Sequence, residues 1–317
     1  MRYRNLQQNY CTNLVISPIE RQSLVTTNGI LFNDCSFPKT FRISKFLKDL
    51  RLTVNHLIIQ KFDLSSKENL LGLNNLSNFS IISTNHVNFD RLFQKSYEDI
   101  LQYLPNLEVL HIENMIADEI PLNFFSYSSK LRKEQFIGLK NLLHLKLILY
   151  GKMHIEDGIF DNLTSLKTLD IYYNVLNQLP QGSFRNLTNL KTICVFVTDN
   201  VRFYRDEPES NDGKLFELSN KLFTNLKSLK IISLRFENSM ELTNNTFADN
   251  FGQLQNLSIT GYKLDTLPSG IFDETRNLKV LQITHSNLTT LPPNIFKNLR
   301  NLEFLDLSYN KLKRLES

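Results

Sequence analysis

The chain has 317 residues, 41% of them hydrophobic and 21% charged, so it can bury a sizeable core and is not of the disordered class. Lys and Arg exceed Asp and Glu by 36 − 32 = 4, and the charges are dispersed, which argues against the concentrated basic face of a nucleic-acid-binding protein. No window approaches about 18 consecutive apolar residues, and the chain starts in polar sequence. The sequence as given therefore predicts neither a membrane span nor a secretory segment.

Residues 1–50 precede the regular part of the chain and contain two of its three cysteines, Cys11 and Cys35. A bridge between them would limit fraying at the first, otherwise uncovered, end of a repeat array, as in an extracellular N-terminal cap. The alternative is two free, buried thiols. Cys194 lies far downstream without a neighbouring base, and we expect it to be free and neither catalytic nor redox-active.

From about residue 51 a leucine pattern repeats at intervals of 24 residues, lengthened in places by insertions. The unit Leu278-x-x-Leu281-x-Ile283, with Phe296 further on, recurs from Leu166 onward. About ten repeats fill residues 51–317, and we expect the last one to be incomplete at the C-terminus. Their lead residues are Val54, Leu76, Leu107, Leu142, Leu166, Leu190, Leu229, Leu254, Leu278 and Leu302.

An L-x-x-L-x-L core predicts a short strand with alternate side chains inward, and the return to the next lead residue makes successive strands parallel. Prolines in the return segment indicate irregular backbone rather than helix. The pattern therefore predicts an α/β solenoid with a curved parallel sheet and a mostly irregular convex side. Phenylalanines at one equivalent position should stack inside it, namely Phe125, Phe160, Phe184, Phe223, Phe247, Phe272 and Phe296.

An Asn at the position that ends the strand can satisfy backbone groups of the next turn, but only Asn174 and Asn310 stand there. Thr84, Thr198 and Ser286 are short polar substitutes, whereas Tyr150, Glu237 and Tyr262 are not. N-x-S/T acceptor patterns for N-glycosylation, which would lie on the surface of an exported protein, number close to chance expectation. They occur at Asn75, Asn78, Asn162, Asn186, Asn244, Asn256 and Asn287.

The unit read from Leu166 to Leu187 and from Leu278 to Leu299 resembles the 24-residue extracellular leucine-rich repeat, whose fold is a horseshoe with a concave parallel β-sheet. The segment from Phe32 to Pro38 around Cys35, with degenerate and then regular repeats after it, resembles the start of an insect Toll ectodomain. That resemblance implies a receptor on the extracellular side of the plasma membrane. It also implies a cystine-knot cytokine ligand of the Spätzle class, dimerisation on ligand binding, and a membrane link only through a missing C-terminal segment with a TIR domain. We expect the chain to be a fragment of such a receptor.

No pattern for catalysis, cofactor binding or metal binding is present. The chain contains no G-x-G-x-x-G, P-loop, H-E-x-x-H, C-x-x-C or G-x-S-x-G, and its six histidines share no column of the repeat. His111 alone falls on an outward strand position, as a surface or binding-face residue rather than a metal ligand. The sequence therefore favours a binding protein over an enzyme.

Apolar and aromatic pairs follow the strand cores of four consecutive repeats, and we expect at least one member of each pair to be exposed. Such residue types, with an Arg, anchor protein interfaces. The candidate ligand-binding residues are Leu149, Tyr172, Tyr173, Phe196, Arg235 and Phe236. The alternative is that they pack between strands or under the charged insertion 199–213, which, like 126–135, should project as a loop.

Two functions use the same solenoid, a leading hypothesis and an alternative. The first is a Toll-like cell-surface receptor fragment that binds a protein ligand in innate immune or developmental signalling. The second is a secreted or matrix leucine-rich repeat protein with an adhesive or scaffolding role.

Overall fold

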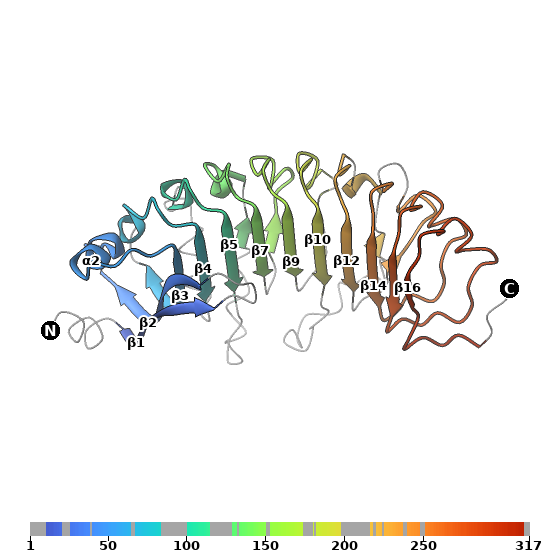
Figure 1. The fold of residues 1–317 in the computed structure, drawn as a ribbon, viewed down its shortest axis with the longest axis horizontal. Helices are drawn as coiled ribbons and strands as arrows, with labels where there is room; N and C mark the ends of the chain where they lie inside the picture. The colour runs from blue at the N-terminus through green and yellow to red at the C-terminus, as the bar shows by residue number, and fades with distance from the viewer. Residues whose placement is uncertain are drawn as a thin grey trace. The chain divides into compact units, whose positions relative to one another are not determined.

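The computed structural model describes residues 11–20, 26–38, 40–64, 67–83, 100–114, 129–131, 133–149, 153–173, 180, 182–197, 216–217, 220–223, 225–236, 240–247 and 251–313. The chain forms two compact units, residues 1–166 and 167–317. Each unit contains a run of parallel strands, one from each repeat, with short turns and 3-10 helices between them (Figure 1).

In the first unit the main sheet has the order β1-β2-β3-β4-β5-β7, and β1 alone runs antiparallel to its neighbour. A smaller sheet pairs β6 with β8. The elements are β1 (Cys11–Glu20), β2 (Thr26–Phe37), α2 (Ile43–Asp49), β3 (His56–Leu64), η1 (Lys67–Leu70), β4 (Asn78–Ser83), η3 (Ile100–Tyr103), β5 (Val109–Asn114), β6 (Ser129–Leu131), η5 (Lys133–Phe136), β7 (His144–Leu149) and β8 (Met153–Ile155).

In the second unit the main sheet has the order β9-β10-β12-β14-β15-β16, all parallel, and a smaller sheet pairs β11 with β13. The elements are β9 (Thr168–Tyr173), β10 (Thr192–Val197), β11 (Phe216–Glu217), η7 (Asn220–Phe223), β12 (Ile231–Phe236), β13 (Met240–Glu241), β14 (Asn256–Gly261), β15 (Val280–Thr284) and β16 (Phe304–Asp306).

The predicted fold class, a leucine-rich repeat solenoid, is confirmed. Every strand that a repeat core predicts is present, and equivalent positions pair in register, for example Leu169 with Ile193 and Ile193 with Ile232. The lead residues Leu166, Leu190 and Leu278 are all 0% exposed. Among the described residues the one α-helix, α2, precedes the repeats, so the described return segments contain no α-helix, as expected; they consist of turns, 3-10 helices and the short strands β6, β8, β11 and β13.

The predicted phenylalanine column is confirmed for the members that the structure describes, with two refinements. Five of them, from Phe160 to Phe272, are at most 1% exposed, whereas Phe296 is half-buried and stacks on Phe272 at 6.4 Å. Phe125 lies outside the described residues. Phe136, with the same F-x-x-L spacing, contacts Phe160 with a centroid distance of 5.9 Å, so it fills the column in that repeat.

In four of the described repeats the asparagine directly before the lead leucine forms a polar link that was not predicted from the sequence. In the first unit Asn106 Nδ2 donates to the Asn74 carbonyl at 2.7 Å and Asn141 Nδ2 donates to the Pro105 carbonyl at 3.0 Å. In the second, Asn277 and Asn301 do the same to the preceding repeat, at 2.6 and 3.1 Å. Each amide therefore satisfies a carbonyl of the repeat before it, which fixes neighbouring turns against each other.

The strand-ending position behaves as predicted at Asn310. Its Nδ2 donates to the carbonyls of Ile283 and Leu307 at 2.6 and 2.9 Å, and its Oδ1 accepts from the Leu288 amide at 3.3 Å. Ser286, at the same place one repeat earlier, is 4% exposed and accepts from the Gly261 amide. Asn174 lies outside the described residues.

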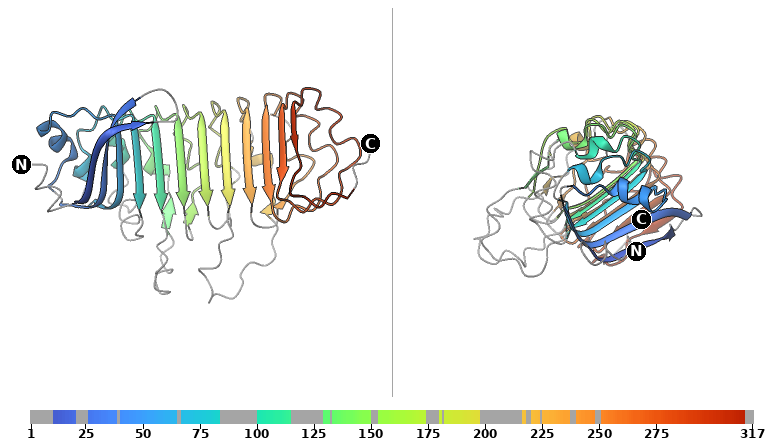
Figure 2. Two further views of the ribbon diagram at one scale, coloured as in Figure 1. Left: turned by 60° about the horizontal axis from the view of Figure 1, so that its bottom comes forward. Right: turned by 90° about the vertical axis from the view of Figure 1, so that its left-hand side faces the viewer.

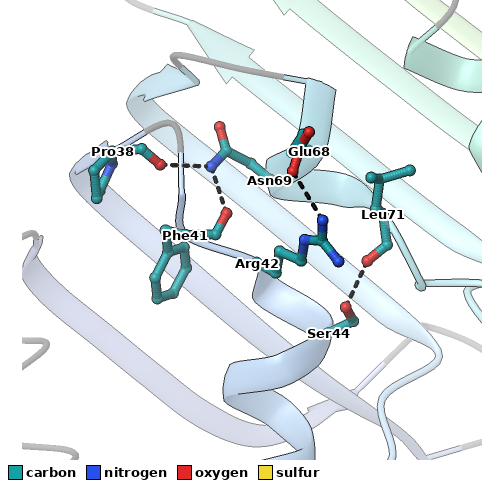
Figure 3. A network of polar contacts seen from close by, with 7 residues as sticks. All are labelled: Pro38, Phe41, Arg42, Ser44, Glu68, Asn69 and Leu71. Atoms are coloured by element: carbon teal, nitrogen blue, oxygen red, sulfur yellow. Dashed lines mark hydrogen bonds and ion pairs between the residues drawn. The ribbon is translucent and has the colours of Figure 1, made fainter.

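The region before the repeats packs as a small aromatic cluster against the first repeat. Phe32 contacts Phe37 and Phe46 with centroid distances of 5.3 and 6.0 Å. The buried side chain of Asn69, on η1, donates to the carbonyls of Pro38 and Phe41 at 3.0 and 2.6 Å (Figure 3). These contacts attach residues 38–50 to the first repeat, as a cap requires; the boundary at residue 50 itself stays a prediction.

Two further elements connect this region to the same repeat. Arg42 pairs with Glu68 at 2.9 Å, and the Ser44 hydroxyl donates to the Leu71 carbonyl (Figure 3). Cys35 is disulfide-bonded and stands opposite Cys11 in the register of β1 and β2, while Cys194 forms no disulfide. The geometry supports the Cys11 to Cys35 bridge that we predict.

Of the two predicted insertion loops, 199–213 lies outside the described residues. The other, 126–135, was predicted to project as a loop, but this is wrong in part, because Ser129 to Leu131 form β6 and pair in parallel with β8. Backbone pairing there satisfies amides and carbonyls that a projecting loop would leave to water.

Replacing Phe272 by Ala should lower the free energy of unfolding by roughly 3 to 5 kcal/mol, because a fully buried ring leaves a cavity between repeats. Lys263→Ala, at an exposed position in the same unit, should change it by less than about 0.5 kcal/mol. Urea unfolding followed by circular dichroism measures both. Equal effects would contradict the assignment of the column to the core.

Replacing Asn69 by Ala should lower the free energy of unfolding by about 2 kcal/mol, because two partly buried carbonyls lose their donor. Hydrogen exchange of α2 amides should accelerate as well, since the cap is then less firmly attached. The control is Asn74→Ala, whose side chain is exposed. Unchanged exchange in α2 would show that Asn69 does not attach the cap.

Candidate functional site

Three of the predicted site residues lie at one register position on the outward face of the second unit's sheet. Tyr172 pairs with Phe196, and Phe196 with Arg235, across β9, β10 and β12. They stand near the carboxyl ends of these strands, which the arrowheads mark in Figure 2. Tyr172 and Phe196 are half-buried and Arg235 is exposed. The strand alternation thus presents two rings and a cation side by side.

These three side chains contact one another directly. The rings of Tyr172 and Phe196 are tilted by 55° with a centroid distance of 5.6 Å. The Arg235 guanidinium carbon lies 4.7 Å from the centroid of the Phe196 ring, a cation–π contact. Its Nη2 donates to the hydroxyl of Tyr262 at 3.3 Å.

The row continues through three residues that follow the next strands. Tyr262 is 42% exposed and contacts His285 with a centroid distance of 6.5 Å. His285 stacks on Tyr309 at 4.2 Å with only 16° between the ring planes, and Tyr309 is 74% exposed. We call the whole row the aromatic ladder; its members are Tyr172, Phe196, Arg235, Tyr262, His285 and Tyr309.

Two members of the aromatic ladder have unusual backbone conformations. His285 and Tyr309 have φ angles of 50° and 57°, in the left-handed region that costs a bulky residue about 1 kcal/mol or more. These two residues and Tyr262 are not among the site residues predicted from the sequence. A signal was present, since His285 and Tyr309 are 24 residues apart, one repeat.

The prediction that Leu149 and Phe236 are exposed ligand contacts is wrong. Each is 1% exposed and is the last inward-facing residue of its strand, Leu149 in β7 and Phe236 in β12. The strands are six residues long, one dipeptide longer than the repeat core suggests, so the last residue points into the core. Ile148 is also buried, at 8%. The side chain of Tyr173 lies outside the described part of the structure.

The phenol of Tyr172 is held in its neutral form. Burial is the first cause of its raised pKa, followed by the negative potential of Cys194 and Asp170 beside it. The hydroxyl therefore keeps its proton at neutral pH, and its hydrogen bond with the Cys194 side chain contributes to the same shift.

In the first unit His111 occupies an outward position of β5, opposite Ser80 and Lys146. Burial and then the charge of Lys146 lower its pKa from 6.5 to about 4. Its Nε2 lies 3.3 Å from Glu113 Oε2 without forming a hydrogen bond, and this carboxylate does not offset the two other effects. The imidazole is neutral at pH 7.

The predicted glycosylation acceptors differ in exposure. Asn75, Asn162, Asn186 and Asn244 are exposed, and Asn256 and Asn287 are half-buried. Asn78 is 4% exposed at the start of β4, where no glycan fits, so we withdraw it.

A polar groove of about 480 Å³ lies across three repeats of the second unit and includes Lys279, Glu303 and two asparagines of the repeat-to-repeat links. Lys279 pairs with Glu303 at 2.9 Å. The polar groups that line the groove thus contribute to the packing of neighbouring repeats. In the described part of the chain no cluster of three or more His, Cys, Asp or Glu side chains could hold a metal ion, and no helix is long and apolar enough to cross a membrane.

Comparison with known proteins agrees with this fold. Residues 153–195 and 252–312 match the family described as Leucine rich repeat. No curated protein sequence gives a match. These two segments thus match leucine-rich repeats.

Solved structures with the same fold include receptors in complex with ligands. The Drosophila Toll in its complex with Spätzle is 19% identical with a TM-score of 0.53, and 89% of this chain aligns to 40% of that one. Mouse RP105 in complex with MD-1 is 20% identical (TM-score 0.57; 90% of this chain, 42% of that), and TLR13 in complex with ssRNA13 is 22% identical (0.53; 83% and 37%). The chain spans about 40% of the length of these structures.

Acidification should destabilise the first unit through His111. Between pH 6.5 and pH 4 the unfolded chain binds a proton that the folded His111 does not, so stability falls as pH decreases through this window. His111→Gln should show a smaller decrease in Tm between pH 7 and pH 4.5, and Lys146→Gln should lie between that variant and the wild type. Identical pH profiles for wild type and His111→Gln would contradict the burial effect.

Proposed function

We propose that the chain is a ligand-binding ectodomain fragment of a Toll-like cell-surface receptor, which lies on the extracellular side of the plasma membrane and binds a protein ligand through the aromatic ladder. The observation that carries this proposal is the ladder itself: six contacting Tyr, Phe, Arg and His side chains, four of them exposed, on one edge of a rigid parallel sheet. Tyr and Arg are enriched at the centres of protein interfaces.

Further support comes from the solenoid and its resemblance to Toll. The disulfide at Cys35 suits an oxidising compartment, and the exposed N-x-S/T acceptors suit an exported protein. A Spätzle-like cystine-knot cytokine is the ligand that the resemblance suggests, with receptor dimerisation as the signalling event. The arrangement favours binding over catalysis.

A secreted or matrix protein with an adhesive role would use the same solenoid. Sequencing the transcript beyond both ends of this segment separates the two: a transmembrane span followed by a TIR domain supports the receptor, and a C-terminal cap followed by a stop supports the matrix protein.

Removing both rings from the centre of the ladder, by Tyr172→Ala with Phe196→Ala, should weaken binding of the Drosophila Spätzle dimer by about 30-fold or more, equivalent to about 2 kcal/mol. Surface plasmon resonance measures the affinity, after melting curves show an intact fold. Ile137→Ala removes another exposed apolar side chain, in the other unit, and should leave binding unchanged. Unchanged affinity of the double variant would reject the ladder as the contact surface.

A further inference from the structure

We propose that the aromatic ladder recognises one extended segment of its protein ligand, in which an acidic side chain binds Arg235 and apolar or aromatic side chains two residues before and after it bind the flanking rings. This inference rests on the proposed function and adds the chemistry and spacing of the recognised segment. It is carried by the fixed position of Arg235, the distances along the ladder and the charges around it.

Arg235 is preorganised to bind a carboxylate. The Phe196 ring holds one face of its guanidinium at 4.7 Å, and Tyr262 accepts one of its five N–H groups at 3.3 Å. No carboxylate lies within ion-pair distance of Arg235 among the residues that the structure describes, and the side chain is exposed. The guanidinium keeps N–H donors for a bidentate contact with an incoming carboxylate. Because the side chain is already held in place, binding costs little side-chain entropy.

The spacing of the ladder fits an extended chain that crosses the strands. Neighbouring strands lie about 4.8 Å apart, so the contacting rings of Phe196 and Tyr172 are together centred about 7 Å from Arg235. The contacting pair Tyr262 and His285 lies at about the same distance on the other side. In an extended peptide the side chains of residues i and i ± 2 share a face and are separated by about 6.6 to 6.8 Å. One segment can therefore contact both ring pairs while its central residue meets Arg235.

The charge distribution favours a peptide over a nucleic acid at this site. Asp170 and Asp306 stand on the outward face of the first and last strands of the same sheet. The pKa of Asp306 is lowered, chiefly by its hydrogen bond with the Ser308 amide, so this carboxylate is ionised at neutral pH. A polyphosphate chain crossing the ladder would meet one Arg between two carboxylates, whereas a single acidic side chain meets only Arg235.

The probe is a fluorescein-labelled, C-terminally amidated peptide of sequence Gly-Ser-Phe-Ser-Glu-Ser-Phe-Ser-Gly, titrated with the full 317-residue chain and followed by fluorescence anisotropy. Changing its Glu to Gln should weaken binding about tenfold or more, because a charge-assisted contact to Arg235 is lost. Changing both Phe residues to Ser should weaken binding similarly. These two comparisons use the unaltered protein and do not depend on the folding of any variant.

The charge-swap variant Arg235→Glu should lose the Glu peptide and gain the corresponding Lys peptide. The matched control, Lys297→Glu, makes the same charge change at an exposed turn away from the ladder and should bind like wild type. Equal binding of the Glu and Gln peptides, or no recovery with the Lys peptide, would overturn the proposal. Preferential binding of a single-stranded RNA nonamer that displaces the peptide would overturn it in favour of a nucleic acid.

Failure of this inference is distinguishable from failure of the proposed function. If the Spätzle dimer binds wild type and Arg235→Glu equally, the receptor function stands and the assignment of Arg235 is wrong. If the peptide binds as described and the dimer does not, the ladder recognises an acidic segment of another protein, and the assignment to Spätzle is wrong.

Discussion

The burial of each repeat's inward side chains against the neighbouring repeats is the constraint on which every other feature depends. Leu169, Ile193 and Ile232 stand at one register position and are all 0% exposed. A slip of one residue would turn these side chains to water and the polar ones inward, so the register admits little variation. The fixed register in turn decides which residues face outward, and hence where Tyr172, Phe196 and Arg235 meet.

Polar side chains reinforce the same register from the edges of the strands. The amides of Asn277 and Asn301 bind carbonyls of the preceding repeat, and Asn310 closes the turn after β16. Irregular backbone leaves many carbonyls without a partner, and an amide supplies donors at a fixed reach. Such bonds allow the return segments to vary in length and still join neighbouring repeats in one way.

The periodicity of 24 residues was sufficient to predict the strands, their parallel order and the buried phenylalanines, because inward positions repeat with little freedom. It did not predict that Leu149 and Phe236 are buried. The end of a strand depends on pairing with the neighbouring strands, and a repeat consensus does not encode that pairing. Phe136 contacts Phe160 in the column, and its spacing to the next leucine, F-x-x-L, is the signal that predicts this place.

The repeat pattern did not predict the other three aromatic members of the ladder, for a different reason. Tyr262, His285 and Tyr309 lie just past the strands, where side-chain direction follows from local φ and ψ rather than from alternation. Their contacts with one another link separate repeats, so no single repeat contains the feature. The exposure of a single aromatic residue is weak evidence for a binding surface. Its stacking on an aromatic residue of the next repeat is much stronger evidence.

The left-handed backbone at His285 and Tyr309 has a consequence for protein engineering. Glycine or asparagine would adopt these φ values with less strain, so a selection for thermal stability alone would favour them. Each such replacement would raise the melting temperature. It would also remove one ring from the aromatic ladder and so flatten the surface there. A more stable version of this solenoid would thus lose part of its candidate binding surface, and optimisation of its scaffold would need to hold these two positions fixed.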